Sequence, residues 1–139
     1  MTTGTMAQSA ILKYGGNALA DVMQQLDSPD PLVRASALNL SLTILERSED
    51  LPSQARASEL IRSALADDDG VVRRNAVMAI ECLDERQTSV PTLQEIAKTD
   101  PFKLPGRAPD GGDGDEFYPV RYDARRVLRD IQDNAGCTR

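Results

Sequence analysis

Apolar residues recur with the same helical spacing at three places along the chain. The three segments align on a Val-Arg pair, whose valines Val33, Val72 and Val120 are 39 and 48 residues apart. Four, seven and eleven residues after these valines stand Ala37, Leu40 and Ile44, then Ala76, Ala79 and Leu83, then Ala124, Val127 and Ile131. At about 100° per residue, these offsets fall on one side of an α-helix. Each segment is therefore predicted to be a helix with one apolar stripe.

A second set of apolar positions, again at helical spacing, precedes each stripe. It comprises Ala18, Val22 and Leu26, then Ala57, Ile61 and Leu65, then Leu93, Ile96 and Ala97. Each repeat is therefore predicted to be a helix pair, at about residues 17–47, 52–85 and 89–134. The predicted organisation is a flexible N-terminus at 1–9, a single repeat domain at 10–134 and a tail at 135–139. A short additional helix is expected around residues 7–14.

Polar residues and prolines mark the predicted turns. Asp30 and Asp69 stand where a side chain can accept the first N–H groups of the second helix of a pair, and Pro31 follows where a missing N–H costs nothing. Pro119 is predicted to begin the last helix, and Gly136 is predicted to stop it. No segment has the pattern of a strand.

The turn and second helix of the first two repeats resemble those of HEAT-like repeats. The segments that carry the resemblance are Asp-Pro-Leu-Val-Arg-Ala-Ser-Ala-Leu at 30–38 and Asp-Gly-Val-Val-Arg-Arg-Asn-Ala-Val at 69–77. They are similar to the repeats of the phycobilisome lyase type, in the armadillo-like superfamily, and the resemblance extends over about residues 17–134. It implies an all-α fold: a short right-handed α-solenoid of about three helix pairs plus a short N-terminal helix.

The same resemblance implies structural roles for five residues. Asp30 and Asp69 would cap helices, and a ladder of hydrogen bonds or ion pairs between neighbouring repeats would involve Arg34, Arg73 and Arg121. The third repeat departs from the pattern, because Phe117 stands where aspartate is expected. Asp115 is the nearest candidate for the missing cap.

Composition excludes much catalytic chemistry. The sequence contains no histidine, so Ser-His-Asp and Cys-His catalysis and histidine metal ligands are absent from it. The formal net charge is −6, which opposes broad attraction to nucleic acid or to an anionic membrane. Cys82 and Cys137 are interpreted as free thiols, because two cysteines make neither a zinc site nor a disulfide-dense scaffold. With no secretory signal or membrane span in the sequence, a cytoplasmic location is expected.

The side of the second helices opposite the stripe is the predicted binding surface, as it is the inner surface of HEAT-type stacks. Its candidate partner-binding residues are Leu38, Leu42, Arg74, Val77, Met78, Tyr122, Arg125, Arg126 and Arg129. Apolar residues followed by an arginine cluster with a tyrosine suit recognition of a protein segment. Two alternatives remain open. The N-terminal stretch or a second copy of the chain covers the apolar positions, or Asp123, Asp130 and Asp133 pair with the arginines.

Residues 101–118 replace a turn of about five residues in the third repeat. Loops of this length are usually functional or disordered. The carboxylates at 110, 113, 115 and 116 are the one plausible hard-metal cluster, but their spacing is not that of an EF-hand. A solvated, mobile loop is therefore expected, with ends that dock through Phe102, Phe117 and Tyr118.

These features predict a non-enzymatic protein-protein interaction module or scaffold, without a cofactor. One alternative, raised by the resemblance, is a bilin lyase-like or chaperone-like subunit acting on a phycobiliprotein, although neither cysteine has a base nearby in the pattern. A second alternative is nucleic-acid binding through Arg125, Arg126 and Arg129. Three repeats are few for a solenoid, so the chain is expected to associate with itself or to cap a larger assembly.

Overall fold

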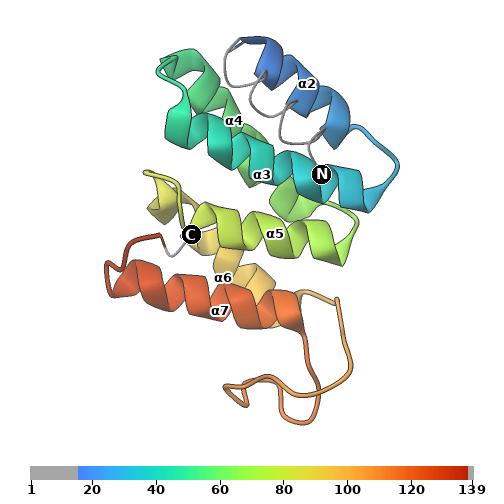
Figure 1. Cartoon of the computed structure of the whole chain (residues 1–139). Coiled ribbons are helices and arrows are strands. Elements are labelled where there is room, and N and C mark those ends of the chain that lie inside the picture. The colour runs from blue at the N-terminus through green and yellow to red at the C-terminus, as the bar shows by residue number, and fades with distance from the viewer. Residues whose placement is uncertain (1–15, 138–139) are drawn as a thin grey trace. The chain divides into compact units, whose positions relative to one another are not determined.

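The computed structural model describes residues 16–137, which form α-helices joined by turns and loops (Figure 1). The helices are α2 (Gly16–Leu26), α3 (Pro31–Arg47), α4 (Leu51–Ser63), α5 (Gly70–Ile80), α6 (Val90–Thr99) and α7 (Pro119–Gln132), with short 3-10 helices at η1 (Ala64–Ala66) and η2 (Arg86–Ser89). Within residues 16–137 no strand forms, and Leu104 and Phe117 make an isolated antiparallel bridge. The predicted flexible N-terminus at 1–9 and the predicted helix at 7–14 lie outside the described residues.

The all-α prediction is confirmed, and the helices group into two compact units. The first unit is Met1–Ala64 and the second is Leu65–Arg139. The boundary falls between the two helices of the predicted second pair, so that α4 belongs to the first unit and α5 to the second.

In the first unit, α3 packs against both α2 and α4. Its core brings together the small and branched residues of the predicted stripes: Ala18, Val22, Ala37, Ile44 and Ala57. The turn before α3 forms as the sequence predicts. The side chain of Asp30 accepts a hydrogen bond from the N–H of Leu32 at 3.0 Å, and Pro31 opens the helix. The cap and the stripe therefore act together, since the cap fixes where the helix begins and hence which side it buries.

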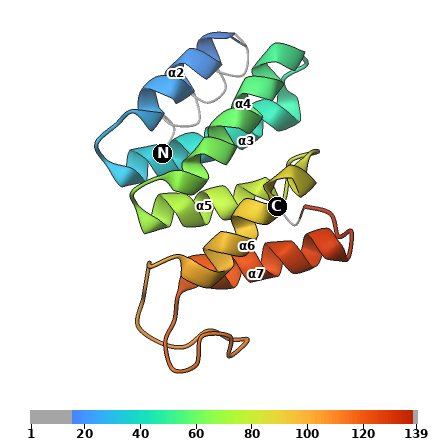
Figure 2. The ribbon, with the colours of Figure 1, turned by 180° about the vertical axis from the view of Figure 1, so that it is seen from behind.

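In the second unit, α7 packs against both α5 and α6. Figure 1 shows α5 and α7 side by side with α6 behind them, and Figure 2 shows α6 in front from the opposite side. The carboxylate of Asp69 accepts hydrogen bonds from the N–H groups of Val71 at 2.8 Å and Val72 at 3.1 Å. The small residues at the centres of the stripes, Ala76 and Ala124, are both fully buried, as is Ala37 in the first unit.

The end of α7 corrects one prediction. The helix stops through Asn134, which has a φ of 56°, and not through Gly136. The N–H of Ala135 donates to the carbonyl of Asp130 at 2.8 Å, and the N–H of Asn134 donates to Ile131 at 3.1 Å. This is the Schellman arrangement, in which the residue after the cap adopts a left-handed conformation that asparagine tolerates better than most residues.

The start of α7 corrects another prediction. The residue at its N-cap position is Tyr118, whose side chain makes no capping hydrogen bond. Asp115, the expected substitute cap, is exposed and pairs instead with Arg107 at 3.0 Å. Asp115 therefore does not take the place of the missing aspartate.

The cysteines also differ from the prediction of free thiols. Cys82, just after α5, and Cys137, in the C-terminal tail, form a disulfide with their Cα atoms 4.8 Å apart. The two residues are 55 positions apart in sequence, and only the packing of α7 beside α5 brings them together. Cys137, in the predicted tail, is therefore covalently tied to the residue two positions after α5.

The described helices are also too short to cross a bilayer. The longest of those between residues 16 and 137, α3, has 17 residues, and it carries charged side chains. No helix in that part of the chain is long and apolar enough for a membrane span.

Candidate functional site

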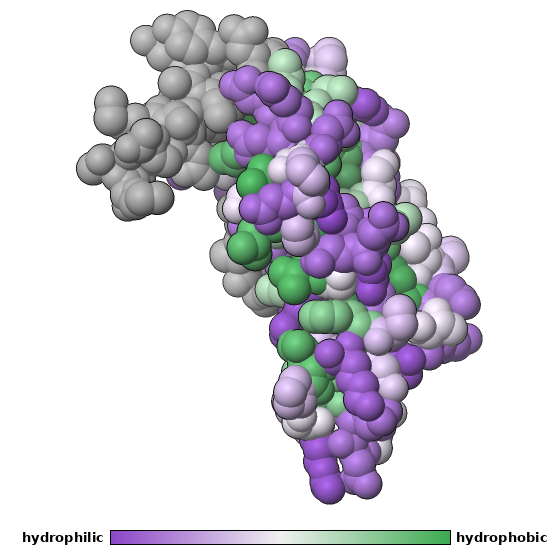
Figure 3. Space-filling model, turned by 90° about the vertical axis from the view of Figure 1, so that its right-hand side faces the viewer, coloured by the Kyte–Doolittle hydropathy of each residue, from purple (hydrophilic) through white to green (hydrophobic). Residues whose placement is uncertain are grey.

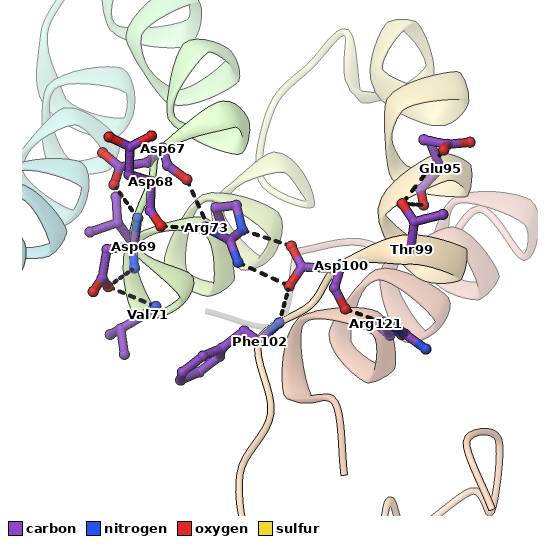
Figure 4. Close-up of polar contacts among 11 residues, drawn as sticks. Asp67, Asp68, Asp69, Val71, Arg73, Glu95, Thr99, Asp100, Phe102 and Arg121 are labelled. Atoms are coloured by element: carbon purple, nitrogen blue, oxygen red, sulfur yellow. Dashed lines mark hydrogen bonds and ion pairs between the residues drawn. The ribbon is translucent and has the colours of Figure 1, made fainter. Parts of the chain in front are cut away.

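Arg73 is held in place at the N-terminal end of α5 by two kinds of acceptor (Figure 4). Its Nε and Nη2 donate to the carboxylate of Asp100 at 2.7 and 3.1 Å. Its Nη1 donates to the backbone carbonyls of Asp67 and Asp68, each at 3.0 Å. The pKa of Arg73 is raised, and the hydrogen bond to Asp100 is the largest cause. The guanidinium thus links the turn before α5 to the residue that ends α6, and this linkage uses four of its five N–H donors.

The corresponding arginines of the other repeats have different partners. Arg121 donates from Nε to the backbone carbonyl of Asp100 at 2.7 Å, and its guanidinium carbon lies 3.7 Å from the ring centroid of Tyr118. Arg34 donates to the carbonyl of Ser28 at 2.9 Å, within its own repeat. All three arginines therefore satisfy backbone carbonyls of loops near their own helices.

Two reciprocal ion pairs join α5 and α7. Arg74 of α5 donates to the carboxylate of Asp123 of α7 at 2.6 Å, and Arg126 of α7 lies 3.6 Å from the carboxylate of Glu81, the residue that follows α5. Both acids are buried, whereas the arginine side chains are 35% and 31% exposed. Each helix, counting the residue that follows α5, therefore supplies one buried acid and one guanidinium that covers the acid of its neighbour.

Met78 lies on the same side of α5 as these pairs, four residues after Arg74 and three before Glu81. It is 45% exposed. Arg129, one turn beyond Arg126 on α7, is also exposed. We call this surface of Arg74, Met78, Arg126 and Arg129 the α5–α7 face.

Three of the predicted binding residues do not reach the surface. Leu38 and Leu42 of α3 and Val77 of α5 are all buried, although the pattern placed them opposite the stripe. The helices are covered on more than one side, so the apolar residues on the second side are core residues. This corrects the expectation that their side chains face solvent and removes them from the candidate site.

The remaining two predicted residues contact the loop at 101–118. Tyr122 packs edge-on against Phe117, with ring centroids 6.3 Å apart. Arg125 binds two loop carboxylates: Nε and Nη2 donate to Asp110 at 2.9 and 3.0 Å, and Nη1 donates to Asp113 at 3.1 Å. The arginine cluster is thus divided, with Arg125 bound to the loop and Arg126 bound to Glu81 and Asp130.

The loop contacts other parts of the chain and itself, mainly near its two ends. Phe102 packs on Gly70 so closely that a Cβ there would lie 2.2 Å from its ring, and Leu104 donates its N–H to Phe117 at 2.9 Å. Lys103 binds Glu116 at 2.6 Å, and this contact lowers the pKa of Glu116 and raises that of Lys103. The outer end of the loop, at the bottom of Figure 3, is mostly hydrophilic.

The loop carboxylates are paired with cations of the chain and not with one another. Their partners are Arg125 for Asp110, Arg121 and Arg125 for Asp113, Arg107 for Asp115 and Lys103 for Glu116. Hydrogen bonding to Arg125 is the main cause that lowers the pKa of Asp110. In the described part of the chain, no group of three or more acidic or cysteine side chains has the geometry to hold a metal ion.

Sequence reasoning missed the acids that bind Arg73 and Arg125, whereas Asp130, which it named as a possible partner of the arginine cluster, does pair with Arg126. Asp100, Asp110 and Asp113 are 27, 15 and 12 residues from their arginine partners, and no periodic pattern connects positions so far apart. The one available signal was charge, because a long acidic loop preceded a helix rich in arginine.

Comparison with known families agrees with the repeat pattern. Residues 19–105 match the family described as HEAT repeats, which leaves most of the loop and all of α7 beyond the matched segment. No curated protein and no solved structure shows significant similarity to the chain. The match extends over more than half of the sequence and includes α3, α4, α5 and α6 together with most of α2. The chain therefore belongs to the HEAT repeat family.

Proposed function

We propose that the chain is a non-enzymatic protein-binding module that binds its partner protein through the α5–α7 face. HEAT repeats commonly mediate protein-protein interaction, which supports the general role. The observation that carries the choice of surface is Met78, a large apolar side chain left 45% exposed one helical turn after Arg74, which is held by Asp123. Met78 also stands three residues before Glu81, which pairs with Arg126. Exposed methionine and arginine are enriched in interfaces relative to the rest of a protein surface.

The ion pairs prepare this surface for binding. Arg74 and Arg126 each rest on a buried carboxylate, so their side chains are ordered before a partner arrives. Ordering a long side chain at an interface costs about 0.5–1.5 kcal/mol, and here the fold has already met that cost. A partner that places an apolar group on Met78 and carbonyl or carboxylate oxygens on the arginines would therefore bind a preorganised site.

Two further observations support protein as the ligand over the alternatives. Arg125 pairs with Asp110 and Asp113, and Arg126 pairs with Glu81 and Asp130, which reduces the positive potential that phosphates would need. The sulfur atoms of Cys82 and Cys137 are joined in a disulfide, so neither is a nucleophilic thiol as the lyase alternative would require.

The test is affinity capture from the native cell, followed by measurement of Kd for the partner obtained. The double variant Met78→Ala/Arg129→Glu changes two exposed residues of the face without touching either ion pair. Its matched control is Met23→Ala/Lys98→Glu, which makes the same kinds of change at exposed residues of α2 and α6. We expect the first variant to bind at least tenfold more weakly, about 1.4 kcal/mol, and the control to bind as the native chain does.

Equal affinities of the two variants would refute the assignment of the face. If the captured partner is a second copy of the chain, light scattering will show a dimer whose dissociation is promoted by the first variant alone.

A further inference from the structure

The outer part of the loop, residues 109–116, occupies Arg125 as a bound ligand would. Asp110 and Asp113, three positions apart, place their carboxylates on the same guanidinium, and Asp113 also lies 3.6 Å from Arg121. Between them, Gly112 lies so close to Arg125 that a Cβ would stand 2.6 Å from its guanidinium carbon. The short segment Asp-Gly-Gly-Asp thus wraps around one arginine side chain.

Charge alone attaches this part of the loop to α7. From Pro109 to Glu116, every residue is exposed except Asp113, which is half-buried. The contacts that anchor the loop lie nearer its base, at the buried Ala108 and the bridge between Leu104 and Phe117. Segments with few buried apolar contacts open at low free-energy cost, so the acidic tip can leave while the base stays closed.

The arginine that the tip covers belongs to a row. Arg121, Arg125 and Arg129 follow one another at four-residue intervals on α7, which places them on one side of the helix. The loop carboxylates contact Arg121 and Arg125, while Arg129 remains exposed. An acidic segment longer than the loop tip could bind all three arginines and would then have a contact that the tip lacks.

We propose that this row, Arg121, Arg125 and Arg129, is a receptor for an acidic segment of the partner protein, and that the loop tip occupies it until that segment displaces it. The expected ligand has two carboxylates three positions apart, as in Asp110 and Asp113, followed by at least one more acid. This inference rests on the proposed protein-binding function and adds to it the chemistry of the ligand and an autoinhibitory contact.

The probe is a fluorescent peptide with the sequence of residues 108–116, Ala-Pro-Asp-Gly-Gly-Asp-Gly-Asp-Glu. It is titrated into the native chain, into Asp110→Asn/Asp113→Asn, and into the control Asp115→Asn/Glu116→Gln, which removes the same charge from loop acids that do not contact Arg125. When the loop tip no longer competes, a larger fraction of the protein has its arginine row free to bind. The apparent Kd for the peptide then falls in proportion to that fraction. We expect at least tenfold tighter binding to Asp110→Asn/Asp113→Asn than to either other protein, and loss of binding when Arg125→Gln is added.

Circular dichroism and thermal melting of each variant establish that it is folded. A second measurement needs no variant, because the amide resonance of Gly112 in the native chain reports the loop position. Excess peptide should shift it toward the value of an unstructured glycine.

Any one of three results would overturn the inference. The peptide could bind all three proteins with equal affinity, it could still bind after Arg125→Gln, or the Gly112 resonance could stay in place when peptide is added. None of these results affects the proposed function, whose test uses Met78 and Arg129 with the captured partner. The two proposals can therefore fail separately. If changing Met78 and Arg129 abolishes binding of the captured partner but the peptide does not bind, the α5–α7 face stands and only the acidic receptor is removed.

Discussion

Arg73 and Asp100 form a two-point ion pair that is almost closed to solvent. Their side chains are 13% and 3% exposed, and the backbone of Asp100 is used as well, since its carbonyl accepts a hydrogen bond from Arg121. The Asp100 carboxylate also accepts the N–H of Phe102 at 3.0 Å. One residue at the end of α6 therefore connects α5, α7 and the start of the loop.

Replacing Asp100 with asparagine should destabilise the second unit strongly. The change leaves the charge of Arg73 without its partner in a site where water does not replace it, and such losses cost about 3–5 kcal/mol. The free energy of unfolding, measured by urea denaturation, should fall by an amount in that range. Asp115→Asn is the control, because its ion pair with Arg107 is 84% and 72% exposed and should contribute less than about 1 kcal/mol. Similar losses for the two variants would mean that the buried pair contributes no more than a surface pair.

A methyl group at Gly70 should be poorly tolerated. The Cβ of Gly70→Ala would lie 2.2–2.6 Å from three atoms of Phe102, so either the ring or the start of α5 must move. We expect a loss of about 1–3 kcal/mol, as for other overpacked sites. Gly136→Ala, where no atom lies within 4 Å of the added Cβ, serves as the control.

Combining Gly70→Ala with Phe102→Ala tests the physical reason for that loss. If the clash is the cause, removing the ring relieves it, and the double variant should be more stable than the sum of the two single changes indicates. Additive losses in thermal denaturation would instead point to a backbone effect at Gly70.

Reduction of the disulfide should lower the melting temperature. The bond between Cys82 and Cys137 spans 55 residues, and closing a loop of this size contributes about 2–4 kcal/mol by restricting the unfolded chain. Thermal melting should shift downward with dithiothreitol for the native chain and stay unchanged for Cys82→Ser/Cys137→Ser. The prediction fails if the native chain has the same melting temperature with and without reductant and also reacts with a thiol dye before reduction. Those two results together would show that the bond does not form.

Acid should release the loop tip. Hydrogen bonding to Arg125 depresses the pKa of Asp110 below its usual value near 3.8, so the folded state holds this proton less tightly than the unfolded chain does. The contact therefore stabilises fully above the unfolded value, and the stabilisation is lost as the pH falls through the lower, folded value. The Gly112 amide resonance should be constant from neutral pH to about pH 5 and should change only in stronger acid.

Arg125→Gln should return the titration of Asp110 toward that of an exposed aspartate. A Gly112 resonance that titrates near pH 4 or above in the native chain would show that Arg125 does not hold the Asp110 carboxylate.

Local chemistry accounts for what was predicted well. The small residues of the apolar stripes, the capping aspartates and the proline that begins α7 all act within one or two helical turns. These residues are Ala37, Ala76 and Ala124, then Asp30 and Asp69, then Pro119. A single sequence contains all the information for such short-range interactions, which is why the helices and their buried stripes could be located from it. The stop at Asn134 was missed because glycine and asparagine compete for the left-handed position at a helix end.

The sequence by itself determined the repeat, the helices and the side of each helix that meets its neighbours. Tertiary structure decided which other residues are covered, since Leu38, Leu42 and Val77 lie on sides that periodicity alone assigns to solvent. It also decided the partners of the charges and of the sulfurs, because Arg125 meets Asp110 and Cys82 meets Cys137 only when distant segments pack together. The physical reason is range: spacing along a helix encodes contacts within a few residues, whereas contacts across the fold depend on how whole helices pack.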